Sequence, residues 1–222
     1  CVRTQQWLKN PPDTHHHALW TLGDAHYPSE LLQLADPPLV IYVAGQTART
    51  LGNAIAIVGS RNPTPQGAQT AAQFGEALSA ADLCVVSGLA LGVDGAAHKG
   101  ALRGGKVREM TPSSARHWHT VAVVGTGLDR VYPRQHQTLA HDIALQGLLI
   151  SEYHLGTAPL AHHFPKRNRL IAALGLGTLV VEAALKSGSL ITAKMALELG
   201  REVLAIPGSI HATQSHGCHA LI

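Results

Sequence analysis

Cysteine is scarce in this sequence of 222 residues, which contains only Cys1, Cys84 and Cys218. They are too few and too scattered for a disulfide framework, and no CxxC pair suggests a zinc site. No apolar run approaches the roughly 20 residues that a membrane-spanning helix needs. The first ten residues, CVRTQQWLKN, lack the apolar core of a signal peptide. We therefore expect a cytoplasmic protein that does not insert into membranes.

Charged and aromatic residues are also sparse. The 17 basic and 14 acidic residues give a formal net charge of +3, and aromatic residues make up 4% of the chain. Any affinity for nucleic acid must therefore come from local clustering of basic residues, with limited base stacking. The 15 histidines titrate near pH ~6.5 when unperturbed, so such binding would be sensitive to pH.

Short apolar runs recur from residue 55 onward, and turns and segments with helical spacing separate them. The runs are Ile55–Val58, Leu83–Val86, Val121–Val124, Leu148–Ile150, Thr178–Val181 and Val203–Ile206. Their continuous hydrophobicity is typical of strands that are covered on both faces. Helical stripes occur at Ala71/Phe74/Leu78, at Leu139/Ile143 and at Leu190/Ala193/Leu197. This alternation predicts an α/β fold with a doubly wound, mostly parallel sheet.

Two further regions lie outside this pattern. Residues 1–54 read as a lead-in that packs on the main domain, 55–222, with a short helix from about Pro28 and an edge strand near Val40. Residues His15–His17 suggest an exposed turn or a flexible end. Residues Arg103–His119 show no hydrophobic periodicity and contain many helix breakers, so we expect an inserted surface loop. Its basic residues could contact a polyanion, but we favour a solvated loop without such a role.

The most informative stretch runs from Phe164 to Gly200. It places a basic cluster, a buried strand and the serine–glycine start of a helix in succession, and the free N–H groups at a helix start can receive phosphate oxygens. In a doubly wound sheet, ligands bind beyond the carboxyl ends of the strands, so the turns after the other strands should face the same edge. The groups concerned are Lys166, Arg167 and Arg169, Ser187–Ser189, Gly59–Arg61 and Ser87–Gly88.

The standard nucleotide-binding motifs are incomplete. Gly125 and Gly127 begin a GxGxxG pattern, but Arg130 takes the place of its third glycine. The segment Gly100–Lys106 imitates a Walker A loop, yet Val107 replaces the Ser or Thr that holds magnesium and no strand precedes it. No Ser–His–Asp set emerges in an interpretable order. The missing Walker and dinucleotide features therefore argue against the usual nucleotide-binding sites.

Two groups of polar residues leave alternatives open. Near Cys218, His211, His216 and His219 match no standard ligand spacing, so we prefer surface histidines to a metal site. Asp94 and His98 lie four residues apart on an expected helix. They are equally compatible with an acid–base pair and with a helix-start charge beside a packed or solvated imidazole.

Glu182 ends the fifth of the expected strands, opposite the basic cluster. A general base would suit this position, but a carboxylate beside guanidinium groups usually stays ionised and structural. We therefore expect Glu182 to pair with Arg167 or Arg169.

Six ordered segments resemble the DprA/Smf family, the DNA-processing proteins of natural transformation, over residues 18–222. They are AIVGSRNPTPQG, VSGLALGVDGAAHKGAL, VAVVGTGLDRVYP, ISEYHLGTAPLAHHFPKRNRLIAAL, LVVEAALKSGSLITAKMALELGREVLAIPGS and SHGCHALI. The resemblance implies an extended Rossmann-like domain that binds single-stranded DNA without sequence preference. It also implies a homodimer that protects incoming DNA and loads the recombinase RecA, with no nucleotide cofactor and no catalysis.

The family's motifs map onto specific residues of this chain. They imply a DNA-binding set of Gly59, Ser60, Arg61, Ser87, Gly88, Phe164, Lys166, Arg167, Asn168, Arg169, Ser187, Gly188 and Ser189. Leu91 stands where the family commonly has arginine, which puts one cationic contact in doubt. Many members carry an added small helical or winged-helix domain, for which this sequence shows no counterpart.

A second resemblance points to an enzyme. The segment Gly175–Ala183 is similar to part of the nucleoside-monophosphate phosphoribohydrolases of the lysine-decarboxylase-like family. In that interpretation Glu182 is catalytic and Arg167 holds a 5′-phosphate. The paired glycines of that family are missing, and fold analogy is a weak argument for function, so DNA binding is the preferred hypothesis.

Overall fold

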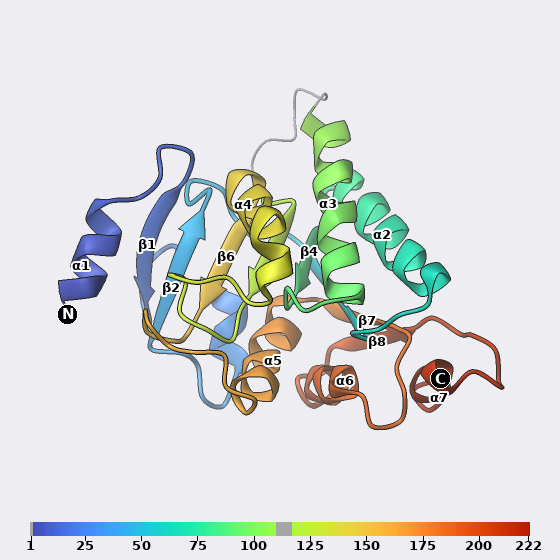
Figure 1. Ribbon diagram of the computed structural model, residues 1–222. Helices are drawn as coiled ribbons and strands as arrows, with labels where there is room; N and C mark the ends of the chain where they lie inside the picture. Colours follow the sequence, from blue (N-terminus) through green and yellow to red (C-terminus); the bar gives the residue numbers. More distant parts are fainter. Residues whose placement is uncertain (1, 110–116) are drawn as a thin grey trace.

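One eight-stranded sheet organises the computed structural model, which describes residues 2–109 and 117–222 (Figure 1). The strands are β1 His16–Thr21, β2 Val40–Gly45, β3 Ala54–Gly59, β4 Cys84–Ser87, β5 Thr120–Val123, β6 Leu148–Ser151, β7 Gly177–Val181 and β8 Glu202–Ala205. Their order across the sheet is β1-β2-β6-β5-β4-β3-β7-β8. All pairs from β3 to β8 are parallel, and β2 pairs antiparallel with both β1 and β6. The expected mostly parallel α/β fold is confirmed.

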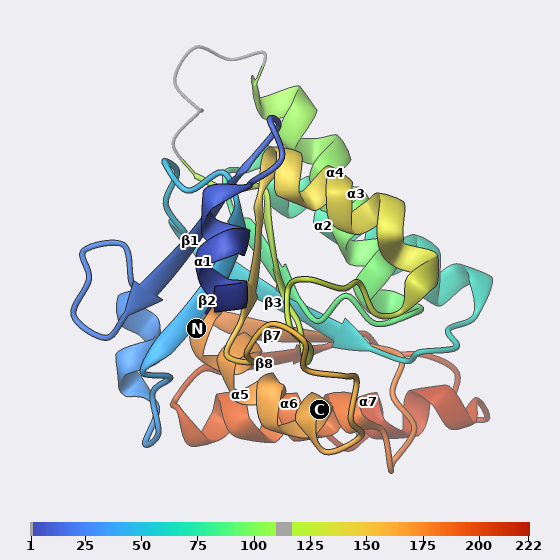
Figure 2. The same ribbon diagram turned by 60° about the vertical axis from the view of Figure 1, so that its left-hand side comes forward.

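Helices cover both faces of the sheet (Figures 1 and 2). The α-helices are α1 Val2–Lys9, α2 Pro65–Ala80, α3 Val93–Glu109, α4 Gln137–Gln146, α5 His163–Leu174, α6 Gly188–Glu198 and α7 His216–His219, and the 3₁₀ turns are η1 Ser29–Gln33, η2 Arg134–His136 and η3 Thr213–Ser215. Helices α2, α3 and α4 lie on one face, and α5 and α6 lie on the other. Within the described residues, none of the helices combines the length and apolarity that a membrane crossing requires.

The strand order reverses at β3. From β3 the chain proceeds through β4 and β5 to β6 in one direction, and β7 and β8 are added on the other side of β3. Along β3 the side chains alternate between the two cores: Ala56 and Val58 pack toward α5 and α6, and Ile57 packs toward α2 and α3. The carboxyl ends of β3 and β7 therefore form the topological switch point, where open α/β sheets bind ligands.

The stripe expected in α2 is only partly right. Ala71 is buried, but the other buried positions of α2 are small residues, and Phe74 is 40% exposed. The reason is close packing against α3, because a Cβ on Gly75 would collide with the carbonyl oxygen of Ala97, and one on Gly100 would collide with that of Ala72. Backbones that approach this closely leave no room for large side chains between the helices.

The first 54 residues contribute two strands to the sheet. The expectation that β2 is an edge strand is wrong, because β2 pairs with both β1 and β6 and leaves β1 at the edge. Of the histidines in the expected exposed turn, His16 and His17 begin β1. The His17 ring stacks on Trp7 with centroids 3.9 Å apart and bonds to the Trp7 carbonyl oxygen. The short helix near Pro28 is the 3₁₀ turn η1.

The surface loop expected at residues 103–119 is wrong for most of its length. Helix α3 continues to Glu109, and Arg103 on it pairs with Glu76 of α2 at 2.8 Å. Trp118 and His119 are buried. The glycines that suggested a loop instead allow close packing, since the His119 ring fills the space beside Gly105. Residues 110–116, including Arg116, lie outside the described residues.

Candidate nucleic-acid interface

An open pocket of about 380 Å³ lies at the carboxyl ends of β3 and β7. Three separate segments meet there: the turn after β3, the first turn of α5 and the start of α6. The predicted residues that line it are Gly59, Ser60, Arg61, Phe164, Arg167, Asn168, Ser187, Gly188 and Ser189. The structure thus brings together most of the set that the sequence indicated, at the edge of the sheet where it was expected.

Arg61 and Phe164 form the mouth of the pocket. Arg61 is exposed, and its guanidinium carbon lies 5.6 Å from the centroid of the Phe164 ring. This distance is within the range of a cation–π contact, which holds the charge next to the ring while leaving its outer N–H groups in solvent. A cation beside an exposed aromatic face can bind a phosphate and a base of the same nucleotide.

The turn between β3 and Arg61 brings the backbone close to β7. A Cβ on Gly59 would collide with the carbonyl oxygen of Val181, so glycine permits this approach. The N–H of Ser60 donates to that same carbonyl at 3.4 Å, and the Ser60 hydroxyl accepts from the N–H of Asn62. Gly59 and Ser60 therefore shape the pocket wall and aim Arg61 at its mouth.

The start of α6 forms the opposite wall and is open. Ser187 is the N-cap residue, and its hydroxyl accepts from the N–H of Ser189. A Cβ on Gly188 would meet nothing within 4 Å, and the neighbouring Lys186 is exposed and also lines the pocket. The positive end of a helix dipole beside a lysine is a favourable environment for an anion.

Arg167 lies in the floor of the pocket and not at its surface. It is 4% exposed, and its Nη1 donates to the carbonyl oxygens of Gly88, at 2.7 Å, and Val123. A Cβ on Gly88 would lie 2.5 Å from Nη1, so glycine makes room for the guanidinium. Burial lowers the pKa of Arg167 to about 10, a shift that Asp94 opposes. Instead of reaching into solvent as the sequence suggested, Arg167 joins α5 to the ends of β4 and β5.

Asp94 holds the loop after β4 and takes no part in an acid–base pair. Its Oδ2 accepts from the N–H groups of Gly88, at 3.2 Å, and Ala90, at 3.3 Å. Burial raises the pKa of this carboxyl, and the nearby Arg167 opposes the shift. Because the Gly88 N–H is already bonded to Asp94, the expectation that it receives a phosphate is corrected.

The other candidates near Asp94 are also held inside the protein. His98 is fully buried beside the hydroxyl of Thr120 at 2.7 Å, and burial lowers its pKa to about 3. The hydroxyl of Ser87 is buried and donates to the carbonyl oxygen of Ile57 at 2.6 Å. His98 therefore stays neutral in the core, and Ser87 braces β4 against β3 instead of contacting a phosphate.

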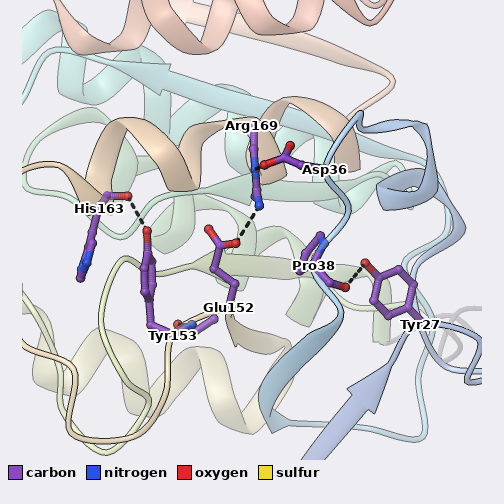
Figure 3. A network of polar contacts seen from close by, with 8 residues as sticks. Tyr27, Asp36, Pro38, Glu152, Tyr153, His163 and Arg169 are labelled. Carbon is purple, nitrogen blue, oxygen red and sulfur yellow. Dashed lines mark hydrogen bonds and ion pairs between the residues drawn. The ribbon is translucent and has the colours of Figure 1, made fainter.

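Arg169 is held by two carboxylates and does not line the pocket (Figure 3). Its Nη2 donates to Glu152 at 2.7 Å, its Nε donates to Asp36 at 3.1 Å, and its side chain is 12% exposed. These two ion pairs tie α5 to the end of β6 and to the segment before β2. Arg169 therefore has a structural role that its place in the basic cluster did not reveal. Lys166, which lies in the sequence between Phe164 and Arg167, is exposed on α5.

Glu182 pairs with neither arginine, so that expectation is wrong. Its carboxylate accepts from the N–H of Thr64, at 2.8 Å, and from the Thr64 hydroxyl. The Thr64 hydroxyl in turn accepts from the N–H of Gly67, which caps α2. The negative charge of Glu182 therefore sits at the N-terminus of α2, where the helix dipole stabilises it.

Two residues at the site, Lys186 and Tyr132, were not predicted from the sequence. Lys186 lines the main pocket, and Tyr132, which is 45% exposed, has its ring centroid 5.5 Å from that of Phe164. A signal for Tyr132 was available, since it lies in the loop after β5 and the loops after parallel strands share one edge of the sheet.

Comparisons with known proteins agree with this architecture. The family model for DNA recombination-mediator protein A matches residues 18–222. Protein Smf of Escherichia coli is 42% identical over 217 residues, which cover 97% of this chain and 54% of the relative. DNA processing protein DprA of Streptococcus pneumoniae is 44% identical over 204 residues, which cover 91% of this chain and 67% of the relative. The chain thus spans about half to two thirds of the length of these relatives.

Solved structures give the same result. The X-ray structure of DprA from Streptococcus pneumoniae has a TM-score of 0.84 at 39% identity and covers 99% of this chain and 71% of that one. A structure of DNA processing protein A from Helicobacter pylori, described as giving insight into its unique single-stranded DNA binding mode, has a TM-score of 0.78 at 31% identity. It covers 91% of this chain and 86% of that one. The chain belongs to the DNA recombination-mediator protein A family.

Proposed function

We propose that this domain binds single-stranded DNA without sequence preference at the switch-point pocket, defined by Arg61, Phe164 and Ser187–Ser189. The observation that carries the proposal is that Arg61, which lies over the Phe164 ring, lines the same pocket as the open start of α6. Phosphates bind the cations and the helix N–H groups, and bases stack on the aromatic face. None of these contacts reads a base edge, so the binding tolerates any sequence.

The positions of the basic side chains indicate which of them can contact DNA phosphates. Arg61, Lys166 and Lys186 are exposed near the pocket, and Arg167 and Arg169 are held by protein partners. Asn168 contributes a polar side chain to the wall. Three side-chain cations correspond to about three neutralised phosphates. The logarithm of the binding constant should then fall with the logarithm of salt concentration with a slope of about −2 for a single strand.

The test is a fluorescence-anisotropy titration of labelled single-stranded oligonucleotides and of the matching duplex at several salt concentrations. We expect preference for the single strand and a slope near −2. Arg61→Gln should weaken binding and reduce the slope by about 0.7. Lys194→Gln is the matched control, because Lys194 is exposed on α6 and pairs with Glu198, outside the pocket. Equal affinity for the single strand and the duplex, or a salt-dependence slope near zero, would refute the proposal.

We also propose that the full-length protein acts as its relatives' names indicate, in DNA processing and recombination in the cytoplasm. In this proposal the bound strand is protected and passed to RecA, and two copies of the chain form a homodimer. The support for RecA loading and for the homodimer is the family membership alone. A stimulation of RecA filament formation by the full-length protein, measured on single-stranded DNA, tests this step.

The nucleoside-monophosphate phosphoribohydrolase hypothesis is less well supported. Its catalytic residue would be Glu182, whose carboxylate is bonded to both polar groups of Thr64. Its phosphate ligand would be Arg167, whose guanidinium is bonded to two carbonyl oxygens. Release of free base from a nucleoside monophosphate, lost in Glu182→Gln, would revive the enzyme hypothesis.

A further inference from the structure

We propose that the bound strand extends beyond the switch-point pocket onto Tyr132, whose ring is a second base-stacking platform beside Phe164. This inference rests on the proposed single-strand binding. It adds a contact made by the loop after β5, which supplies none of the residues described above as binding DNA.

The first observation is the exposure of Tyr132 next to the pocket. Its side chain is 45% exposed, and its ring centroid lies 5.5 Å from that of Phe164 with the two ring planes tilted by 32°. At this separation the rings contact each other, so a base cannot enter between them. Tyr132 is 45% exposed, so part of its ring remains accessible, and a base that follows the one on Phe164 can stack there.

The second observation is a small hollow that links the two rings. It has a volume of about 70 Å³ and shares Arg61, Ala90, Phe164 and Arg167 with the main pocket. Its remaining walls are formed by Gly88, Tyr132, Pro133 and Leu91, which is 39% exposed. The surface from the start of α6 to Tyr132 is therefore continuous, and it changes along its length from cationic to apolar and aromatic.

This change from a cationic to an apolar surface indicates which part of a nucleotide binds at each end of the continuous surface. The phosphates bind near Lys186 and the start of α6, where charge and N–H groups are available. At the other end, Leu91, Pro133 and the two aromatic rings match the apolar face of a base, and Arg61, which lines both the hollow and the main pocket, can hold a phosphate between the two ends. The chemistry of the hollow thus favours a nucleobase of the same strand.

The loop holds Tyr132 in position before any ligand binds. The N–H of Gly127 donates to the Thr157 carbonyl oxygen at 3.2 Å, and the N–H of His136 donates to the Pro133 carbonyl oxygen at 3.0 Å. The buried His136 ring bonds to the carbonyl oxygen of Leu89, which fixes the loop against the end of β4. A ring that is ordered in advance loses little conformational entropy when a base stacks on it.

The experiment compares Tyr132→Ala and Tyr132→Phe on an oligothymidine and on an oligonucleotide of the same length with abasic sites. We expect Tyr132→Ala to weaken oligothymidine binding roughly tenfold, the effect of losing one base–aromatic stack, and Tyr132→Phe to change it less than twofold. The salt slope should be the same in both variants, because no phosphate contact is lost. On the abasic oligonucleotide, Tyr132→Ala should bind as the wild type does.

Two controls separate stacking from damage to the fold. Phe74→Ala removes an aromatic ring of similar exposure, 40%, from α2 outside the pocket and should leave binding unchanged. Tyr132→Ala should still unfold cooperatively in urea, with a midpoint somewhat below that of the wild type, because about half of Tyr132 is buried and its ring contacts Phe164.

Each remaining outcome would overturn the inference. Unchanged oligothymidine binding by Tyr132→Ala would refute it while leaving the proposed function intact, and so would an equal loss on the abasic oligonucleotide. Failure of the wild-type protein to bind single-stranded DNA would overturn the proposed function and this inference with it.

Discussion

Two helices begin at the switch point, α2 after β3 and α6 after β7, and their N-termini have opposite surroundings. At the start of α2, Thr64 caps the helix and the carboxylate of Glu182 accepts from the Thr64 N–H and hydroxyl. A Cβ on Gly67 would collide with that carboxylate, so the side chain packs directly on the first turn. The anion that the α2 dipole attracts is thus part of the protein.

At the start of α6, the part of the chain that the structure describes places a hydroxyl and not a carboxylate on the helix N–H groups. Ser187 caps the helix with a hydroxyl, Gly188 faces open space and Lys186 adds positive charge. Both helix starts have the same intrinsic attraction for anions. The difference shows that the availability of a helix start to a ligand depends on whether a carboxylate of the protein already occupies it.

The largest expected effect comes from removing the internal anion of α2. Glu182→Ala leaves the N–H and hydroxyl of Thr64 without their charged acceptor, which should lower the free energy of unfolding by about 2–3 kcal/mol. Urea denaturation followed by circular dichroism measures the change. Glu182→Gln, which keeps one acceptor oxygen, should lose about half as much. The folded Glu182→Ala protein should bind single-stranded DNA at least as tightly as the wild type, and an unchanged stability would show that α2 does not depend on this carboxylate.

An intermediate effect comes from giving α6 the anion that it lacks. Aspartate is a good N-cap residue and its charge suits the helix dipole, so Ser187→Asp should stabilise the fold by a few tenths of a kcal/mol. The same charge should repel phosphate and weaken binding of a single strand about tenfold, or ~1.4 kcal/mol. Ser187→Asn, a neutral N-cap of the same shape, is the matched control. Equal affinities of the Asp and Asn variants would show that phosphate does not bind at this helix start.

The smallest expected effect concerns the hydroxyl cap of α2. Thr64→Ala removes the acceptor for the Gly67 N–H and should cost about 1 kcal/mol in the free energy of unfolding. Thr64→Ser keeps the hydroxyl and should cost much less. Both variants should bind single-stranded DNA as the wild type does, since α2 presents no site to the strand. A loss of affinity in Thr64→Ala alone, measured by anisotropy, would mean that the two helix starts are not independent.

The fold could be read from the sequence because strands covered on both faces leave uninterrupted apolar runs. The six expected runs correspond to β3 through β8. The errors came from packing between distant segments. Glycines in α3 were taken as loop residues, because the sequence does not show that Gly104 and Gly105 lie against a neighbouring helix and a histidine ring.

The position of the site was also predictable, but the directions of its side chains were less so. The buried stripe of α5 at Leu170, Ile171 and Leu174 places Arg167 on the same inward face, three to seven residues earlier. That stripe was visible in the sequence. What the sequence could not supply was the identity of the buried guanidinium's partners, the carbonyl oxygens of Gly88 and Val123, which come from other strands.

The antiparallel pairing of β2 with β6 also fixes an order of events during synthesis. Tyr42 pairs with Ser151, so β2 leaves the ribosome before the whole of β3, β4 and β5 and cannot reach its place until β6 follows. At roughly 5–20 residues per second, that interval lasts several seconds or more. A two-stranded ribbon such as β1–β2 is only marginally stable by itself. Strands β1 and β2 are thus made before β3, β4 and β5 but are secured only after β6, and for that time the apolar face of β2 is exposed to other chains.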